Sequence, residues 1–460
     1  MTEPQDTTPA EPVASFFVGV PDVRVDDLVG ARGACEHVRK LAARLRDPAR
    51  LAALGVSPPR GVLLAGSRGA GKASLAYALA AEAGQPIVHV KVSDLALLGH
   101  DAVEARVRAA FDEARAKAPA VVLLDDLDAW AKVADRARVP ADRAKVALLV
   151  SLLDALARDG ARVLVVGAVA DLESVDDTLR LPGRLEDAIA VGLPDAEARK
   201  TFLARRLAQH PAIDAAALDL LARRTVRDTV TQLETMVRHA GYRAFDAGRD
   251  ALVLEDLLGA RRSLRCGAVA DGMVMSAAAR HVVAAHEAGH AIVQLFDGPR
   301  RGVEFVTIVP STSGALGLHV AETIEVDDVR DTVEVRHRIA VMLGGREAER
   351  LLAGGPDGLA TGAMSDLRRA TMFASVAVTQ QGLDAVFGPL AIDCIPRDGR
   401  AGLDALAVER TRAWVEAGEA RARELLAQHR PAWEAVTAAL LAEEELDGER
   451  VEQLVAGAEA

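Results

Sequence analysis

Residues 61–82 place a short apolar run, a glycine-rich loop and a helical pattern in direct succession, an order that few folds accommodate. The run 61–65 (GVLLA) predicts a strand and residues 72–82 predict a helix. Between them, residues 66–72 read GSRGAGK, the pattern of a P-loop. Its glycines let backbone N–H groups close around a phosphate, while the helix dipole and the lysine ammonium neutralise charge. The predicted phosphate-binding residues are Gly66, Gly69, Gly71 and Lys72.

Apolar runs alternate with helical patterns as far as about residue 195. The predicted strands are 86–90, 120–124 and 162–166, and the predicted helices are 102–117 and 143–157. Strands that alternate with helices imply a parallel sheet with helices on both faces. Beyond this region, residues 196–262 have a helical pattern throughout, and helices dominate from residue 277, with strand-like interruptions at 303–310 and 317–323.

These patterns predict a multidomain protein. The expected fold class is an α/β P-loop domain with a parallel sheet and an all-α lid, followed by a mainly α-helical domain. The expected boundaries are a disordered lead at 1–22, the α/β domain at 23–195, the lid at 196–262, a linker at 263–276 and the helical domain at 277–460.

A second apolar run, residues 121–126 (VVLLDD), ends in paired acids and has the form of a Walker B strand. Asp125 is the expected magnesium ligand, and Asp126 stands where a longer acid usually polarises the attacking water. Asp126 retracts that carboxylate by one methylene, about 1.5 Å. Ala73 follows the P-loop lysine and has no hydroxyl for the metal, while Ser74 lies about 100° further round the helix. The sequence therefore predicts bound nucleotide and leaves magnesium binding open.

The segment 286–290 (HEAGH) matches the H-E-x-x-H pattern of zinc sites. His286 and His290 are one helical turn apart, so both imidazoles face the same ion, and Glu287 lies beside them as the expected general base. Taken alone, the motif also fits two histidines packed on an apolar helix. The sequence thus predicts Zn²⁺, with Glu287 as the catalytic residue.

Charge and cysteine content narrow the classes of partner and compartment. The formal net charge of −12, without a basic stripe, argues against a nucleic-acid partner. The three cysteines, Cys35, Cys266 and Cys394, are far apart and predict reduced thiols in a cytoplasmic protein. No signal peptide is recognisable, and no apolar run is long enough to cross a bilayer, so we expect no direct insertion into membranes.

With these residues in hand, the chain resembles the FtsH family of AAA+ ATP-dependent zinc metalloproteases, peptidase family M41, from about residue 23 to about residue 455. The segments that carry the resemblance are the P-loop, the strand ending at Asp125, 26–30 (DDLVG), 181–184 (LPGR), 191–195 (VGLPD), 286–290, 344–346 (GGR) and 361–366 (TGAMSD). The resemblance implies that Asp366 is the third zinc ligand. It also implies polypeptide substrates, held extended along the strand around residues 315–318, and a homo-hexamer in which Arg184 reaches a neighbour's nucleotide site.

The chain departs from the family pattern mainly in the ATPase half. Besides Ala73 and Asp126, the sensor-1 asparagine is replaced by Ala170 and the second arginine after the sheet by Asp187. The pore loop, 95–100 (LALLGH), has no aromatic residue, and we expect the family's N-terminal membrane anchor to be absent. These changes affect magnesium, the attacking water and phosphate sensing, so we expect nucleotide binding with slow or no hydrolysis.

Three functions fit the sequence. The first is an FtsH-like zinc metalloendopeptidase coupled to an AAA+ ring that degrades unfolded or loosely folded proteins. The second is an ATP-independent metallopeptidase on a pseudo-ATPase scaffold, and the third is a non-proteolytic AAA+ remodelling or scaffold protein. Among the other histidines, His281, His319 and His337 have no partner pattern. Glu347 and Glu349 fit a role in orienting the site, but a solvated helix face is the expected one.

Overall fold

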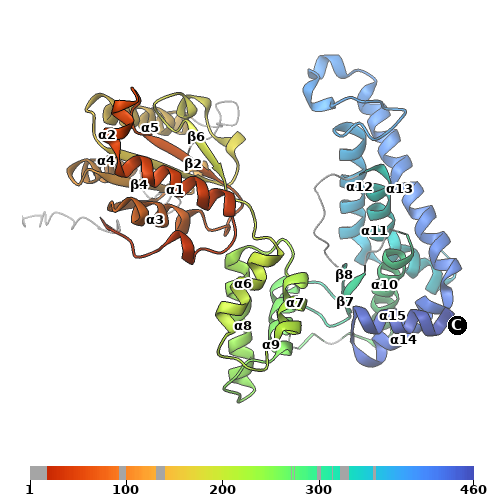
Figure 1. The fold of residues 1–460 in the computed structure, drawn as a ribbon. Helices are drawn as coiled ribbons and strands as arrows, with labels where there is room; N and C mark the ends of the chain where they lie inside the picture. The colour runs from red at the N-terminus through yellow and green to blue at the C-terminus, as the bar shows by residue number, and fades with distance from the viewer. Residues whose placement is uncertain are drawn as a thin grey trace, which may run out of the picture. The chain divides into compact units, whose positions relative to one another are not determined.

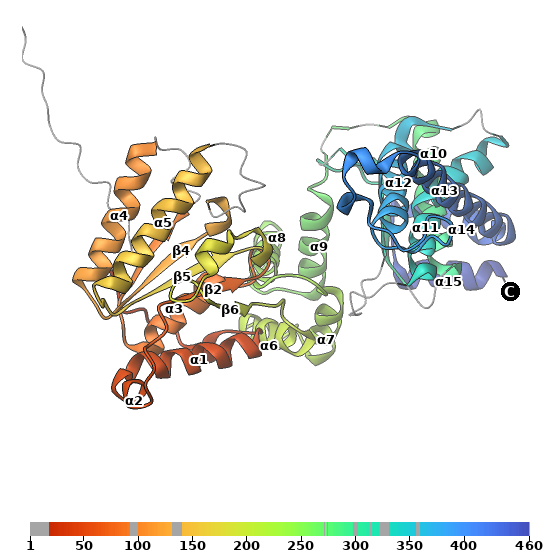
Figure 2. The same ribbon diagram turned by 90° about the horizontal axis from the view of Figure 1, so that it is seen from above.

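The computed structural model describes residues 18–92, 100–130, 140–270, 272–273, 275–297, 302–312, 314–321, 331–355 and 359–459. The chain divides into two compact units, Met1–Arg238 and His239–Ala460, which are described separately (Figures 1 and 2). Most of the expected N-terminal lead and residues 95–99 of the expected pore loop lie outside the described residues.

The first unit contains a six-stranded sheet in the order β1-β3-β4-β5-β2-β6. Its strands are β1 (Val18–Gly19), β2 (Gly61–Ala65), β3 (Ile87–Lys91), β4 (Ala120–Asp125), β5 (Val163–Val169) and β6 (Asp187–Ala190). Five of them run parallel, and β1 pairs antiparallel with β3 at one edge. The predicted parallel α/β fold is thus confirmed. Since β2 and β4 are parallel, the P-loop and Asp125 follow them at the same edge of the sheet.

Helices cover both faces of this sheet (Figure 1). The helices of the first unit are α1 (Arg32–Arg46), α2 (Pro48–Ala53), α3 (Lys72–Ala83), α4 (His100–Ala116), α5 (Pro140–Arg158), α6 (Ala196–Leu207), α7 (Ala215–Arg224) and α8 (Val230–Asp246), which continues into the second unit. Alternate strand residues pack in opposite directions. Leu64 and Leu123 pack with α1 and α3, whereas Leu63 and Val122 pack with α4 and α5. The central strands β2 and β5 are therefore apolar throughout, and β4 is apolar up to Asp125, as a sheet buried on both sides requires.

The second unit is mainly helical and carries one small antiparallel sheet in the order β8-β7-β9. Its elements are α9 (Leu254–Cys266), α10 (Ala277–Phe296), β7 (Val303–Thr307), β8 (Leu318–Ala321), α11 (Thr332–Ala353), α12 (Met364–Thr379), α13 (Leu403–Gln428), α14 (Arg430–Glu443), β9 (Glu445–Asp447) and α15 (Gly448–Glu459). Helix α9 runs to Cys266, inside the segment expected as a linker. The mainly helical character predicted for this half is confirmed.

Glycines bring α10 and α11 into backbone contact. A Cβ atom at Gly289 would lie 2.4 Å from the Ala348 Cβ and 2.5 Å from the Gly344 carbonyl oxygen. A Cβ at Gly344 would in turn lie 2.8 Å from the Gly289 oxygen. Only hydrogen fits at these two positions, so the two helices approach more closely than larger side chains would allow. This contact fixes the helix that carries the H-E-x-x-H motif.

A buried carboxylate links the loop after α12 to α13. Asp384 accepts hydrogen bonds from the Arg410 guanidinium, from Trp414 Nε1 at 2.7 Å and from the Phe387 backbone N–H at 2.7 Å. Burial alone would raise the pKa of Asp384, but these donors hold it well below its usual range. The carboxylate therefore stabilises the fold while it is ionised.

We expect Asp384→Asn to lower the free energy of unfolding by about 3 kcal/mol at neutral pH, because Arg410 and Trp414 lose their charged acceptor. Since the folded-state pKa is depressed, the wild-type advantage is complete above the unfolded pKa of about 3.9 and is lost as the pH falls further. Urea unfolding followed by circular dichroism at neutral and acidic pH measures both effects. The exposed Asp393→Asn is the control, and equal stability of the two variants at neutral pH would contradict the prediction.

Candidate metal centre and nucleotide site

Helix α10 presents His286 and His290 on one buried face. The helix begins at Ser276, whose side chain caps it by accepting the Ala279 N–H, and residues 284–294 are buried. Spacing of one turn brings the two Nε2 atoms to 3.1 Å from each other. The pairing that the motif predicts is present in the structure.

Asp366, in the first turn of α12, is the third candidate metal ligand. Its Oδ2 lies 3.3 Å from His286 Nε2 and 3.5 Å from His290 Nε2, and the three donor atoms lie within 4.8 Å of one another. Ligands of a tetrahedral zinc ion with bonds of about 2.0–2.1 Å are separated by roughly 3.3 Å. Two nitrogens and one oxygen at this spacing fit Zn²⁺ and leave a fourth position for water or substrate.

The second nitrogen of each imidazole is already bonded to the protein. His286 Nδ1 lies 2.7 Å from Glu349 Oε1, and His290 Nδ1 lies 2.6 Å from the Val341 carbonyl oxygen. Because the Nδ1 atoms donate to these oxygens, the Nε2 lone pairs face the metal position. The other carboxylate oxygen of Glu349 accepts the Ala360 N–H at 2.8 Å. The expectation that Glu349 lies on a solvated helix face is therefore wrong, because it is buried beneath His286.

The field at this site favours positive charge. Burial lowers the pKa of His286, but the carboxylates of Asp366 and Glu349 outweigh it and raise that pKa to about 10. Burial likewise raises the pKa of Asp366, and the two imidazoles hold it below its usual range. A cation placed among the three donors satisfies the same field without protonating the histidines.

Glu287 lies beside the metal position in an apolar setting. Its side chain is buried, and burial raises its pKa despite the nearby imidazoles. The start of strand β8 packs directly on it. A Cβ at Gly317, the residue before this strand, would lie 2.8 Å from Glu287 Oε1, and the backbone N–H of His319 in the strand donates to the carboxylate. Burial thus makes this carboxylate a stronger proton acceptor than an exposed glutamate.

His319 belongs to this site although no sequence pattern predicted it. Its ring stacks on His290 with centroids 6.0 Å apart, and its Nε2 is buried with no hydrogen-bond partner among the described residues. Burial lowers its pKa to about 3, so the imidazole is neutral. His281 is exposed, and His337 is buried with Nδ1 3.3 Å from Asp297, so neither reaches the metal position.

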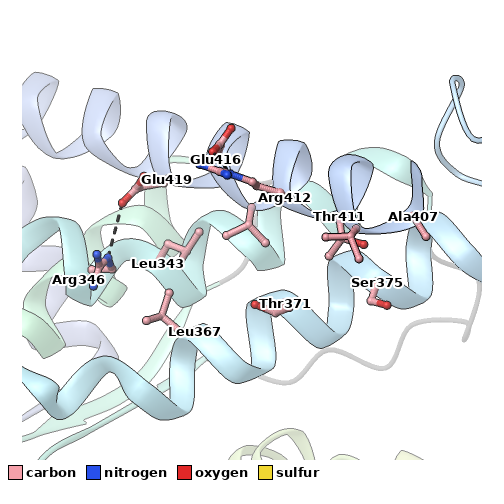
Figure 3. Close-up of a pocket in the computed structure, with 12 residues that line it drawn as sticks. Leu343, Arg346, Leu367, Thr371, Ser375, Ala407, Thr411, Arg412, Glu416 and Glu419 are labelled. Atoms are coloured by element: carbon pink, nitrogen blue, oxygen red, sulfur yellow. Dashed lines mark hydrogen bonds and ion pairs between the residues drawn. The ribbon is translucent and has the colours of Figure 1, made fainter. Parts of the chain in front are cut away.

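A separate hollow of about 550 Å³ lies between α11, α12 and α13 (Figure 3). Leu343 and Leu367 line it, and Arg346 at one end pairs with Glu419 at 3.6 Å. Arg346 and Leu367 directly follow Gly345 and Asp366 in sequence, yet no metal ligand is among its lining residues. The hollow is therefore distinct from the metal centre.

In the first unit, carbonyl oxygens of the P-loop accept hydrogen bonds from the lysine at its end. Lys72 Nζ donates to the carbonyl oxygens of Gly66 and Ser67 at 2.7 and 3.0 Å. Gly69 and Gly71 have φ of +79° and +93°, conformations that favour glycine. The Thr231 hydroxyl from α8 donates to the Gly69 carbonyl oxygen at 3.3 Å, so the helical segment expected as the lid also contacts this loop. The four predicted phosphate-binding residues therefore lie together in one loop.

Asp125 and Asp126 lie at the end of β4. This strand is a neighbour of β5, which in turn is a neighbour of β2, the strand that precedes the P-loop. Asp125 Oδ2 lies 3.7 Å from His89 Nε2, and this imidazole is the largest influence holding the pKa of Asp125 below its usual value. Asp126 has a left-handed backbone with φ of +56°, which aspartate tolerates better than most residues. His89 is a member of the site that sequence reasoning missed.

The residues present do not fit the usual magnesium site of a P-loop. Ala73 carries no hydroxyl, Ser74 is exposed, and Asp125 already has an imidazole beside it. A magnesium ion at this site would therefore lack its usual hydroxyl ligand. Its usual carboxylate ligand, Asp125, would already have an imidazole beside it.

Arg184 lies in a bidentate ion pair with Asp154 of the same unit, with distances of 2.8 and 3.0 Å, and donates to the Thr178 carbonyl oxygen at 2.6 Å. Ala170 directly follows β5 and is exposed, and Asp187 is an exposed residue of β6. Neither of these two positions carries the side chain that the family pattern would place there.

The described helices include none with the length and apolar character needed to cross a bilayer. Cys35, Cys266 and Cys394 are all free thiols.

Comparisons with known proteins agree with both the metal centre and the nucleotide site. Residues 62–193 match the family model "ATPase family associated with various cellular activities (AAA)", and residues 273–454 match "Peptidase family M41". The ATP-dependent zinc metalloprotease FtsH of Methylibium petroleiphilum is 34% identical over 457 residues, which cover 95% of this chain and 73% of that protein. The ATP-dependent zinc metalloprotease FtsH 1 of Sorangium cellulosum is 33% identical over 450 residues, with 94% and 72% covered. With an AAA module followed by an M41 peptidase domain, the chain belongs to the FtsH family.

Proposed function

We propose that this chain is a zinc metalloendopeptidase that hydrolyses peptide bonds in unfolded or loosely folded proteins. The observation that carries the proposal is the convergence of His286, His290 and Asp366 at 3.1–3.5 Å beside the buried Glu287. A structural zinc site would be closed by a fourth protein ligand, whereas two imidazoles and one carboxylate leave a position open for chemistry.

Each residue of the centre has a definite task in this proposal. When bound, Zn²⁺ supplies Lewis acidity that polarises the scissile carbonyl and acidifies water. Glu287 accepts the proton of the attacking water and passes it to the leaving amine. Glu349 and the Val341 carbonyl orient the two imidazoles. Strand β8 lies at the edge of its sheet, so its free side can hold a substrate strand by backbone hydrogen bonds, a mode that tolerates many sequences.

We further propose that the AAA module binds nucleotide but hydrolyses it slowly or not at all. Lys72 and the glycine loop support binding, while Ala73, Asp126 and Ala170 remove groups on which phosphoryl transfer depends. A second candidate function is therefore an ATP-independent peptidase on a pseudo-ATPase scaffold, which the His89 imidazole favours because it lies beside Asp125, the acid expected to bind magnesium.

A casein-cleavage assay with and without ATP, and with and without a zinc chelator, tests these functions together. Chelator-sensitive cleavage that does not respond to ATP supports the ATP-independent peptidase. Cleavage that requires ATP would point to the coupled protease, and bound zinc without cleavage would point to a non-proteolytic remodelling or scaffold protein.

Lys72→Ala is expected to weaken ATP binding at least about tenfold while leaving casein cleavage unchanged, because the ammonium neutralises phosphate charge and has no part in peptide hydrolysis. Labelled-ATP binding and casein cleavage on the same preparation measure both. The exposed Lys117→Ala is the matched control. ATP turnover near one per second in the wild type, abolished by Lys72→Ala, would contradict the pseudo-ATPase proposal.

The quaternary structure and the domain limits remain proposals. We propose a homo-hexamer, on the resemblance to the family, with boundaries at 23–195, 196–262, 263–276 and 277–460. Native mass measurement tests the first, and limited proteolysis tests whether the chain is cut between residues 263 and 276. A monomeric mass at working concentration would exclude the ring, together with the role of Arg184 at a neighbouring site.

A further inference from the structure

We propose that the P-loop site takes a nucleoside triphosphate without a divalent cation, with His89 in the place that magnesium holds next to Asp125. The proposal rests on the nucleotide binding proposed above and goes beyond it. It concerns which groups balance the charge around the phosphates rather than whether hydrolysis occurs.

The first argument is position. Strands β3 and β4 are parallel neighbours in which Lys91 pairs with Asp125 and His89 pairs with Leu123. His89 and Asp125 therefore lie on the same face of the sheet, and that face is covered by α3, the helix that begins at Lys72. Each side chain is about one-fifth exposed, and the two are 3.7 Å apart. The imidazole thus lies beside Asp125 on the face of the sheet that α3 covers.

The second argument is the hydrogen bond on the far side of this imidazole. The Tyr77 hydroxyl from α3 lies 2.9 Å from His89 Nδ1, with the two rings nearly perpendicular at 83°. If the hydroxyl donates to Nδ1, the proton of a neutral imidazole is on Nε2, facing the Asp125 carboxylate. The other tautomer would turn a lone pair towards that carboxylate. In the tautomer with the proton on Nε2, as in the doubly protonated ring, an Nε2–H group faces Asp125 at 3.7 Å.

The third argument is charge. In an ordinary P-loop site the cation lies between the phosphates and the Walker B acid and relieves their repulsion. Here the His89 imidazole lies 3.7 Å from that carboxylate. Ala73 withdraws the hydroxyl that normally completes the metal's coordination. Phosphate charge is left to Lys72 and the loop N–H groups, which need no metal.

The test is calorimetric titration of the full-length, zinc-loaded protein with ATP in metal-free buffer and again with excess MgCl₂. Dialysis is used instead of a chelator so that the zinc stays in place. We expect the two dissociation constants to agree within about threefold. Binding that magnesium tightens by about tenfold or more would overturn this proposal while leaving nucleotide binding itself intact. Absence of ATP binding in both buffers would overturn both.

A paired substitution reverses the expected behaviour. Ala73→Thr with His89→Ser returns a hydroxyl to the loop and frees Asp125, so magnesium should now tighten ATP binding about tenfold. If this double variant fails to fold by circular dichroism, His89→Asn alone is used, with metal-free affinity expected to fall about tenfold and magnesium expected to restore it. Metal-free affinity that is unchanged in the folded variant would overturn the role assigned to His89.

Discussion

Glu287→Gln is expected to reduce kcat/KM for casein hydrolysis by about a thousandfold while the protein keeps its zinc. Glutamine has nearly the same shape as glutamate and fits the same buried position against β8, but it accepts no proton from water. Because His286, His290 and Asp366 are unchanged, metal content should stay at the wild-type level. Cleavage kinetics and zinc analysis of one preparation separate loss of the base from loss of the metal.

The matched control is Glu452→Gln, which makes the same chemical change at an exposed position of α15. It should cleave casein at the wild-type rate. If Glu287→Gln retained more than about a tenth of the wild-type activity, proton transfer by this carboxylate would be ruled out as the main contribution to catalysis. Loss of zinc together with activity would assign Glu287 to holding the site instead.

Gly345→Ala is expected to lower zinc affinity by about a hundredfold or more, with cleavage falling in step with zinc occupancy. The added Cβ would lie 2.4 Å from His286 Nε2, the atom that faces the metal. Residue 345 is within α11, so the Cβ cannot turn away unless the helix moves. The close contact of Gly289 with Gly344 prevents that movement. The imidazole must therefore leave its position, and competition with a chelating dye measures the consequence.

Gly355→Ala is the control for Gly345→Ala, because a Cβ at Gly355, just beyond the end of α11, would meet no atom within 4 Å. It should bind zinc as tightly as the wild type. Wild-type zinc affinity in Gly345→Ala would mean that His286 does not occupy the position described here. Circular dichroism distinguishes local displacement of the ring from unfolding of the helices.

The sequence predicted those parts of the fold whose signals are local and repeated. Strand β2 was predicted with the bounds it has, and β3, β4 and β5 were predicted to within a few residues, since strands buried on both faces are apolar throughout. Strand β9, Glu445–Asp447, had no such signal because it has three residues and pairs with a strand more than a hundred positions earlier. Its place depends on tertiary contacts that periodicity does not encode.

The same distinction applies to the site. His286, Glu287 and His290 form a local pattern, whereas Asp366 is 80 residues from His286 and entered through the family resemblance. Glu349 was misread because a glutamate among charged residues on a helix resembles a solvated side chain. Only the packing of α11 on α10 buries it. His89 reaches Asp125 on the neighbouring strand, and a single histidine in an apolar run gives no sign of such a neighbour.

The bond from the Ala360 N–H to Glu349 ties the approach to α12 to the same carboxylate that orients His286. The Glu349 side chain thus orients His286, and it also anchors the backbone at Ala360, six residues before Asp366. Transplanting residues 286–290 into another scaffold would carry over two metal ligands without Glu349, whose hydrogen bonds help to position the third ligand, Asp366. The smallest portable version of this centre therefore spans α10, α11 and the start of α12.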